Sequence, residues 1–446
     1  MRKNLKVLAL PFVTIGSCFA LIGCNEKYDV KLTVYNWEDY IYEGVDEMDN
    51  IVGDSIVKMF EKSYFEETGL KVKVDYINFS TNEDMYKQLK LGSIHPDLVC
   101  PSDYMIQKMA NENMLEKFSY NEEEDSYDES LSAWDEYGSP FIRDRFANEK
   151  LANGESFLQY AVPYFWGTMG FTYDPSKFQG EYATLINSWE ALWCKDSAYK
   201  GKFSLKDSMR DTYLPAIFHV YKDEIAALDK DADDYTEKLS EIFNRCDDET
   251  IAKVEAALVE AGKSTVYGLE VDEGKDDIVK GTYWANLAWS GDAVYSMDSA
   301  EEDDNKILNY SLPEEGSNVW FDGWCMPKGA NTELAEAFVN FISMPENAVL
   351  CMDAVGYTSP VVGDEIWEYV EDCYAADDDE EDYYTVDLSF YFGEEAKINI
   401  PTSEKGRQFD AQYPTEEMLR RCCIMKDFGE QTSKVEAMWA RVKATF

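Results

Sequence analysis

The segments KLTVYN (residues 31–36), KVKVDYI (71–77) and PDLVCP (96–101) are rich in β-branched and aromatic residues, and they predict three β-strands. Between the first and second of these strands, and again between the second and third, apolar residues recur at helical spacing. We predict one helix that ends at Gly69 and another over residues 83–91. Parallel strands need crossover connections of this kind. The β-α-β-α-β order therefore predicts a parallel sheet covered by helices.

A second set of alternating elements begins near Val162. Strands are predicted near residues 203–205, 283–289 and 320–326, and helices near 211–222, 249–261 and 334–342. Polar, acidic stretches at about 120–155, 297–310 and 370–386 lie between the predicted elements, and we interpret them as insertions. The predicted fold class is therefore α/β.

The composition narrows the classes of function. The chain has 446 residues and a formal net charge of −47, which argues against a nucleic-acid partner because phosphate binding needs a basic surface. Hydrophobic residues make up 45% of the chain, too many for a disordered acidic protein. With two histidines, His95 and His219, a His-rich metal site is excluded, and no Walker A loop or GxSxG elbow is present. We expect no metal, no cofactor and no catalysis.

The N-terminus indicates export. Basic residues precede an apolar run over residues 7–23 that is short for a membrane span and typical of a secretory signal. The run ends in LIGC at residues 21–24, which resembles a bacterial lipobox. We therefore expect residues 1–23 to be a signal peptide, Cys24 to be lipid-modified, and residues 24–28 to form a short tether. The body of the protein is then expected in water, at the outer face of the cell membrane or in the periplasm.

Aromatic residues and carboxylates occur together where the predicted strands end. Ligands of open α/β sheets bind beyond the carboxyl ends of the strands, so these clusters are candidate site residues. The clusters are Trp37 to Tyr40, Ser102 to Tyr104, Asp207 with Asp211, Trp289 to Asp292, and Trp320 with Asp322.

An organic cation suits such clusters. A desolvated ammonium needs strong acceptors, which ionised carboxylates provide, and aromatic faces attract it by about 0.5–2 kcal/mol each. Flat rings also bury methylene groups, at about 0.8 kcal/mol for each CH₂. An alkyl diamine or polyamine has both features. The sequence therefore predicts a polyamine ligand.

Several strings, in this order, resemble spermidine/putrescine-binding proteins of bacterial ABC importers. They include VYNWEDY (residues 34–40), DLVCPSDY (97–104), WSGD (289–292) and VGYTSP (355–360). The resemblance extends over roughly residues 28–430. It implies a type II periplasmic-binding-protein fold, with two α/β lobes, a hinge and a ligand cleft, and a membrane permease as partner. The implied lobes are residues 29–165 with about 314–366, and residues 166–313 with about 367–446.

The resemblance also implies roles for single residues. Asp322 is expected to meet a central or terminal amine, Asp39 an amine near the other end, and Ser102 to donate or accept a hydrogen bond. Asp211 keeps the second acid of a family pair, whereas Ser208 replaces the first, which leaves open whether spermidine or putrescine is preferred. The residues expected to line the methylene path are Trp37, Tyr40, Tyr104, Trp289, Trp320 and Tyr357.

Two alternatives remain open from the sequence. The same scaffold can bind another small cationic ligand or an amino acid, and an arginine facing the cleft would favour an anionic ligand. The other alternative is a secreted carbohydrate-active enzyme, because aromatics and paired carboxylates also build sugar clefts. The alternating α/β order argues against that enzyme.

Overall fold

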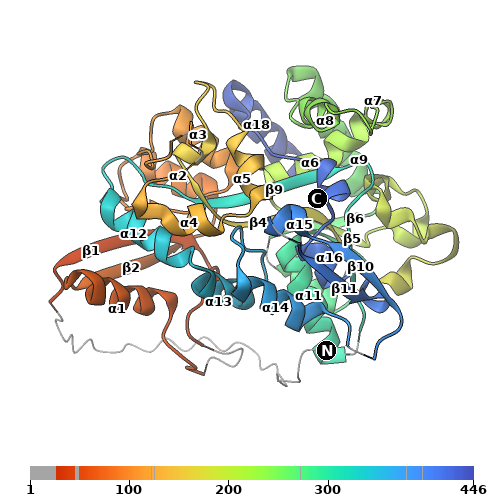
Figure 1. Cartoon of the computed structure of the whole chain (residues 1–446). Helices are drawn as coiled ribbons and strands as arrows, with labels where there is room; N and C mark the ends of the chain where they lie inside the picture. Colours follow the sequence, from red (N-terminus) through yellow and green to blue (C-terminus); the bar gives the residue numbers. More distant parts are fainter. Residues whose placement is uncertain are drawn as a thin grey trace, which may run out of the picture.

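The computed structural model describes residues 27–45, 50–121, 123–124, 126–271, 273–304, 306–377, 379–393 and 395–446. Within these ranges the strands form a three-stranded sheet, a seven-stranded sheet and a two-stranded hairpin. Figure 1 shows helices packed around both larger sheets. The predicted signal peptide and Cys24 lie outside the described residues.

The first sheet contains the three strands predicted at the start of the chain. Its order is β2-β1-β3 and its strands are parallel, with β1 at Val30–Trp37, β2 at Val72–Phe79 and β3 at Leu98–Val99. Two crossover helices, α1 (Ile56–Thr68) and α2 (Asn82–Lys90), connect them, and α3 (Asp103–Asn111) follows β3. Gly69 ends α1 with φ 73°, a left-handed conformation that glycine adopts without strain. The predicted β-α-β-α-β unit is confirmed.

The second sheet has the order β12-β9-β4-β7-β5-β6, and β8 pairs with β4 outside this path. Strands β5, β6 and β7 run parallel, whereas β4 is antiparallel to both β7 and β9. The bounds are β4 Val162–Tyr173, β5 Phe203–Lys206, β6 Val266–Glu270, β7 Ala285–Trp289, β8 Asn309–Ser311, β9 Ser317–Trp324 and β12 Cys422–Cys423.

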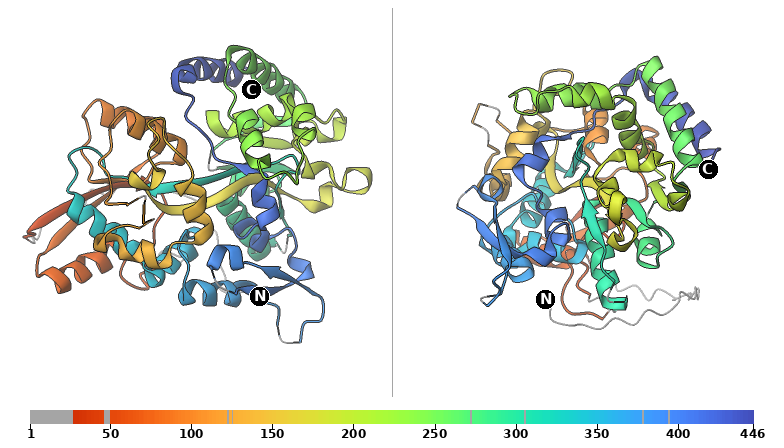
Figure 2. Two further views of the ribbon diagram at one scale, coloured as in Figure 1. Left: turned by 45° about the horizontal axis from the view of Figure 1, so that its top comes forward. Right: turned by 90° about the vertical axis from the view of Figure 1, so that its right-hand side faces the viewer.

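Strands β4 and β9 run between the two lobes. Just beyond the end of β9, Cys325 forms a β-bridge with Val99, and within β9 Asp322 forms one with Ser102, so that β9 meets both sheets. Figure 2 (left) shows these strands, yellow and teal, crossing between the red-orange and the green parts of the chain. The α/β architecture with two lobes and crossover strands is thus confirmed.

The buried side chains form two hydrophobic cores. One packs around the first sheet and includes Trp134, Trp324 and Phe338, and the other packs around β5 and includes Trp189 and Phe203. The predicted division of the chain between the lobes stays a prediction.

The acidic stretch at about 120–155 is more than an inserted loop. It contains α4 (Ser132–Tyr137) and α5 (Pro140–Ala147), and the side chains of Trp134 and Phe146 are 0% exposed. Trp134 and Phe146 join the first core. That this stretch is an insertion stays a prediction.

The remaining helices cover the sheets, and no helix in the described part of the chain has both the length and the apolarity to cross a membrane. A hairpin of β10 (Tyr383–Asp387) and β11 (Lys397–Pro401) lies beside them. The helices are α6 Met209–Val220, α7 Lys222–Ala226, α8 Tyr235–Phe243, α9 Asp248–Lys263, α10 Glu273–Val279, α11 Ser290–Asp304, α12 Thr332–Ile342, α13 Pro345–Val355, α14 Asp364–Tyr374, α15 Ser389–Phe392, α16 Gln408–Gln412, α17 Glu416–Arg420 and α18 Thr432–Lys443.

Candidate functional site

Most of the predicted site residues meet where the two sheets adjoin. Most of them stand at or shortly after strand ends, since parallel strands place their carboxyl ends at one edge of a sheet, whereas Asp211 lies in α6 and Tyr357 follows α13. The residues joined by hydrogen bonds, ring contacts or electrostatic interactions are Tyr40, Ser102, Tyr104, Asp211, Trp289, Trp320, Asp322 and Tyr357.

Asp322, on β9, has the most unusual environment of these residues. Its side chain is buried, with the residue only 6% exposed, and its Oδ2 accepts a hydrogen bond of 2.8 Å from the Tyr40 hydroxyl. Its Oδ1 is buried and has no hydrogen-bond partner. Burial raises the pKa of Asp322 from 3.8 to about 6, although the nearby hydroxyls of Ser102 and Tyr40 partly oppose the shift. A carboxylate left in this state is ready to accept a cationic donor.

Aromatic rings lie beside this carboxylate. The ring centroid of Tyr357 is 5.6 Å from that of Tyr40 and 5.2 Å from that of Trp320, both in edge-to-face geometry. Phe165 of β4 packs against Tyr40 at 5.2 Å. These contacts hold the rings in fixed orientations, as expected for aromatic pairs of this geometry.

The hydroxyl of Tyr357 continues the network to the second lobe. It donates a hydrogen bond of 2.9 Å to Oδ1 of Asp292, whose Oδ2 lies 2.7 Å from Nζ of Lys206. Lys206 is 1% exposed, also donates to the carbonyl of Val271 at 3.0 Å, and has its Nζ 3.7 Å from the ring centroid of Trp289. The site thus contains an internal cation.

Asp211 is a further half-buried carboxylate, in the first turn of α6. Its backbone N–H donates to Oγ of the helix cap Ser208 at 3.3 Å. Burial raises the pKa of Asp211, although side-chain hydrogen bonds with Ser208 and Trp289 oppose the shift. The negative charge of Asp211 in turn contributes to the raised pKa of Asp322, which places both acids in one electrostatic environment.

The first-lobe side of the site is organised by Asn82, at the start of α2. Its buried amide donates to Oγ of Ser102 and to the hydroxyl of Tyr104, each at 3.1 Å. The hydroxyl of Tyr104 donates in turn to Oε1 of Glu83 at 3.1 Å. Burial raises the pKa of Glu83, and Asp211 adds to the shift. A third carboxylate therefore belongs to the same region.

Within the described residues, neither Trp37 nor Asp39 forms a hydrogen bond or a ring contact with this cluster. Trp37 packs against Phe79, with ring centroids 4.6 Å apart, and its buried indole N–H has no partner. Asp39 is exposed and has φ 51°, because the chain turns outward after β1. A ligand-binding role for these two residues stays a prediction.

Comparison with known proteins places this arrangement in a family. The profile of the bacterial extracellular solute-binding proteins matches residues 55–363. The chain belongs to this family. A putrescine-binding periplasmic protein, SpuD, from Pseudomonas aeruginosa is 26% identical over the full length of both chains. Another, PotF from Escherichia coli, is 24% identical over 81% of this chain and 85% of its own.

The fold of this solute-binding protein is also that of solved relatives. The structure of the spermidine/putrescine ABC transporter substrate-binding protein PotD from Streptococcus pneumoniae aligns with a TM-score of 0.60 and 23% identity, covering 94% of this chain and 99% of that one. The type II periplasmic-binding-protein fold expected from the sequence is therefore confirmed.

Sequence reasoning missed several members of the candidate site. It assigned no role to Asn82 or Glu83, although both lie in NEDMY (residues 82–86), another of the strings that resemble the family. It also left open whether Asp292 faces ligand or water, and it did not consider Lys206. Lys206 could have been found because it ends the strand FSLK (residues 203–206), which is buried, and a buried lysine needs a partner.

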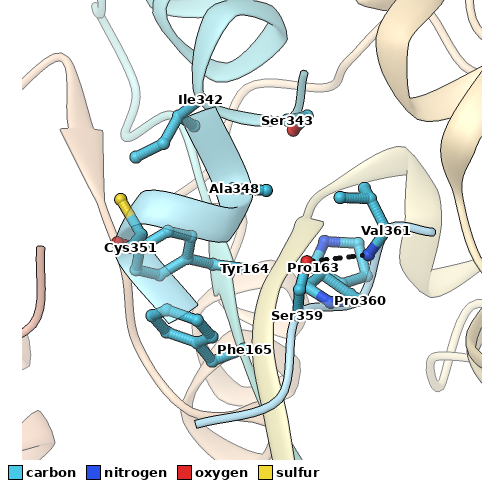
Figure 3. Close-up of a pocket in the computed structure, with 10 residues that line it drawn as sticks. All are labelled: Pro163, Tyr164, Phe165, Ile342, Ser343, Ala348, Cys351, Ser359, Pro360 and Val361. Atoms are coloured by element: carbon cyan, nitrogen blue, oxygen red, sulfur yellow. Dashed lines mark hydrogen bonds between the residues drawn. The ribbon is translucent and has the colours of Figure 1, made fainter. Parts of the chain in front are cut away.

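Figure 3 shows a small cavity behind the aromatic side of the site. It lies between β4, the loop at residues 359–361 and the helices α12 and α13, and its volume of about 10 Å³ holds about one water molecule. Tyr164 and Phe165 separate it from Tyr40 by ring contacts. It is a packing defect in the wall of the site and is too small for a solute.

Gly291 is required by the close approach of Tyr357. A Cβ at this position would lie 2.5 Å from Cε1 of Tyr357. We expect Gly291→Ala to displace that ring and to lower the free energy of unfolding by about 1–3 kcal/mol, as overpacking does. Denaturant unfolding measures the change. Gly268→Ala is the control, because a Cβ there would meet nothing closer than 3.8 Å, and equal effects of both substitutions would contradict the prediction.

Proposed function

We propose that this solute-binding protein captures a polyamine, putrescine or spermidine, between its lobes and delivers it to an ABC importer without chemical change. The observation that carries the proposal is Oδ1 of Asp322, a buried acceptor without a partner beside the rings of Tyr40, Trp320 and Tyr357. An ammonium group would supply the missing donor. The rings would pack on the methylene groups.

The charge of the site supports a cationic ligand. Asp322, Asp211 and Glu83 interact electrostatically, and burial raises the pKa of each. A bound cation would relieve both the burial cost and the mutual repulsion of these acids. The names of the relatives from Pseudomonas aeruginosa and Escherichia coli point to the same class of ligand.

The basic residues of the site do not favour an anionic ligand, because Lys206 is paired with a carboxylate and Arg210, although its buried Nε has no hydrogen-bond partner among the described residues, interacts electrostatically with Asp103, Asp211 and Asp427. Lys206 is held by Asp292 and the carbonyl of Val271. Arg210 donates to the carbonyl of Lys426, and its guanidinium carbon lies 3.9 Å from the ring centroid of Phe428.

Delivery requires motion, because Tyr40, Trp320 and Tyr357 are each less than a tenth exposed. We propose that the lobes, residues 29–165 with 314–366 and residues 166–313 with 367–446, open about the crossover strands to admit the ligand and then close. The closed form would be recognised by a membrane permease. Export after removal of residues 1–23, and anchoring by a lipid on Cys24, complete the proposal.

Isothermal titration calorimetry with putrescine, spermidine and spermine tests the function. We expect saturable binding of at least one of them at micromolar concentration. An amino acid such as arginine and a neutral disaccharide serve as comparison ligands for the two alternatives. The absence of binding heat for all three polyamines would overturn the proposal.

A further inference from the structure

Lys206 is an ammonium group that the chain itself places inside the site. Its strand, β5, is buried along its whole length, and the side chain extends from the end of this strand toward α11. At 1% exposure, its amine is cut off from water. A charge in such a place is stable only with close partners.

The partners of Lys206 are those that would bind a free ammonium ion. Oδ2 of Asp292 accepts at 2.7 Å, the carbonyl of Val271 accepts at 3.0 Å, and the face of Trp289 lies 3.7 Å away. One carboxylate, one neutral acceptor and one aromatic face together satisfy both the charge and the N–H donors of an alkylammonium. The environment is therefore an amine subsite, and it is occupied.

This subsite is continuous with the rest of the proposed site. Asp292 also accepts from the hydroxyl of Tyr357, and the Tyr357 ring packs against both Trp320 and Tyr40. Trp289 also interacts with Asp211 through a side-chain hydrogen bond. A ligand chain that follows these rings away from Asp322 would therefore reach Lys206.

We propose that the ammonium group of Lys206 occupies one amine subsite of the site. The ligand that the site accepts would therefore carry one ammonium group fewer than it could if this subsite were empty. The proposal rests on the polyamine function for the class of ligand. It makes Lys206 a specificity-determining residue that favours a diamine over a triamine. The acids left for the ligand are Asp322, Asp211 and Glu83.

Lys206→Met tests the proposal. Methionine keeps the apolar stem but ends one atom short of Nζ, which leaves the ammonium position between Asp292 and Trp289 open. We expect the wild-type protein to bind putrescine more tightly than spermidine, and the variant to change the ratio of the two dissociation constants at least fivefold toward spermidine. Lys202→Met is the matched control, because Lys202 also lies over a tryptophan, Trp284, at 5.1 Å, and precedes the same strand. Its ratio should equal the wild-type ratio.

Thermal unfolding with n-propylammonium chloride gives a readout that does not depend on polyamine binding. Lys206→Met leaves Asp292 buried without its cation, so we expect a lower Tm that n-propylammonium raises again, beyond the effect of equal sodium chloride. The wild-type protein, the Lys202→Met variant and the Lys206→Met/Asp292→Asn double variant should show only the smaller increase that binding of the amine at Asp322 gives, and the Tm increase of the single variant is counted as the excess over theirs. If the Lys206→Met variant folds poorly, the same measurement shows whether n-propylammonium restores its folding.

The outcomes separate this inference from the proposed function. A Tm increase in the single variant without any polyamine binding by the wild-type protein would overturn the function and keep the occupied subsite. Polyamine binding without a Tm increase would keep the function and overturn the inference. A Tm increase with an unchanged ratio of dissociation constants, or a wild-type preference for spermidine, would overturn the role of Lys206 in specificity.

Discussion

Replacing Asp322 with asparagine is expected to weaken the binding of putrescine or spermidine at least tenfold. Asparagine keeps the shape of the side chain and its hydrogen bond with Tyr40, which measures 2.8 Å in the wild-type protein. It removes the negative charge that a desolvated ammonium needs as a partner. Because the carboxylate is buried, neither water nor salt would replace this charge. Calorimetric titration of the variant gives the dissociation constant directly.

Asp75→Asn is the matched control for this experiment. Asp75 lies on β2 and pairs with Lys31 at 2.6 Å, but its side chain is 40% exposed and lies outside the site. The substitution changes the net charge of the protein by the same amount, so it separates a local contact from a general electrostatic effect. An unchanged dissociation constant for Asp322→Asn would show that Asp322 does not meet the ligand.

The framework of the site could be predicted from the sequence because it follows from rules about strand ends. The alternation of strands and helices over residues 31–104 is strong, and Ser102, Tyr104, Trp289 and Asp322 each stand at or near a strand end. Such residues gather at one edge of a sheet whatever the remaining loops do.

The partners within the site could not be predicted in this way. The pair Lys206 and Asp292 joins residues far apart in the chain, and only the packing of β5 against β7 brings them within 2.7 Å. The burial of Trp134 depends likewise on contacts with distant segments, which an acidic local composition conceals. Local pattern describes elements well, but it does not say which charges the fold pairs.

The second large effect is a pH dependence of binding. In the ligand-free protein, burial raises the pKa of Asp322 to about 6, with a contribution from the charge of Asp211. An ammonium beside the carboxylate would lower this pKa again, so binding favours the ionised form. We expect the dissociation constant of putrescine to be about tenfold larger at pH 5 than at pH 7, because at pH 5 about nine-tenths of Asp322 would be protonated in the free protein.

In the ligand-free protein, a rise in pH acts on stability in the opposite direction to its effect on ligand affinity. A carboxyl group with a raised pKa binds its proton more tightly in the folded state, so its contribution to stability is full below pH 4 and is lost as the pH rises through 6. Unfolding of the ligand-free protein should therefore show this contribution decreasing over the pH range in which ligand affinity increases. The Asp322→Asn variant should lose most of both trends, although Asp211 and Glu83, whose pKa values are also raised, keep a dependence of the same sign. A wild-type affinity that is constant from pH 5 to pH 7 would mean that the ligand's charge is met by other groups, and would remove Asp322 from the centre of the site.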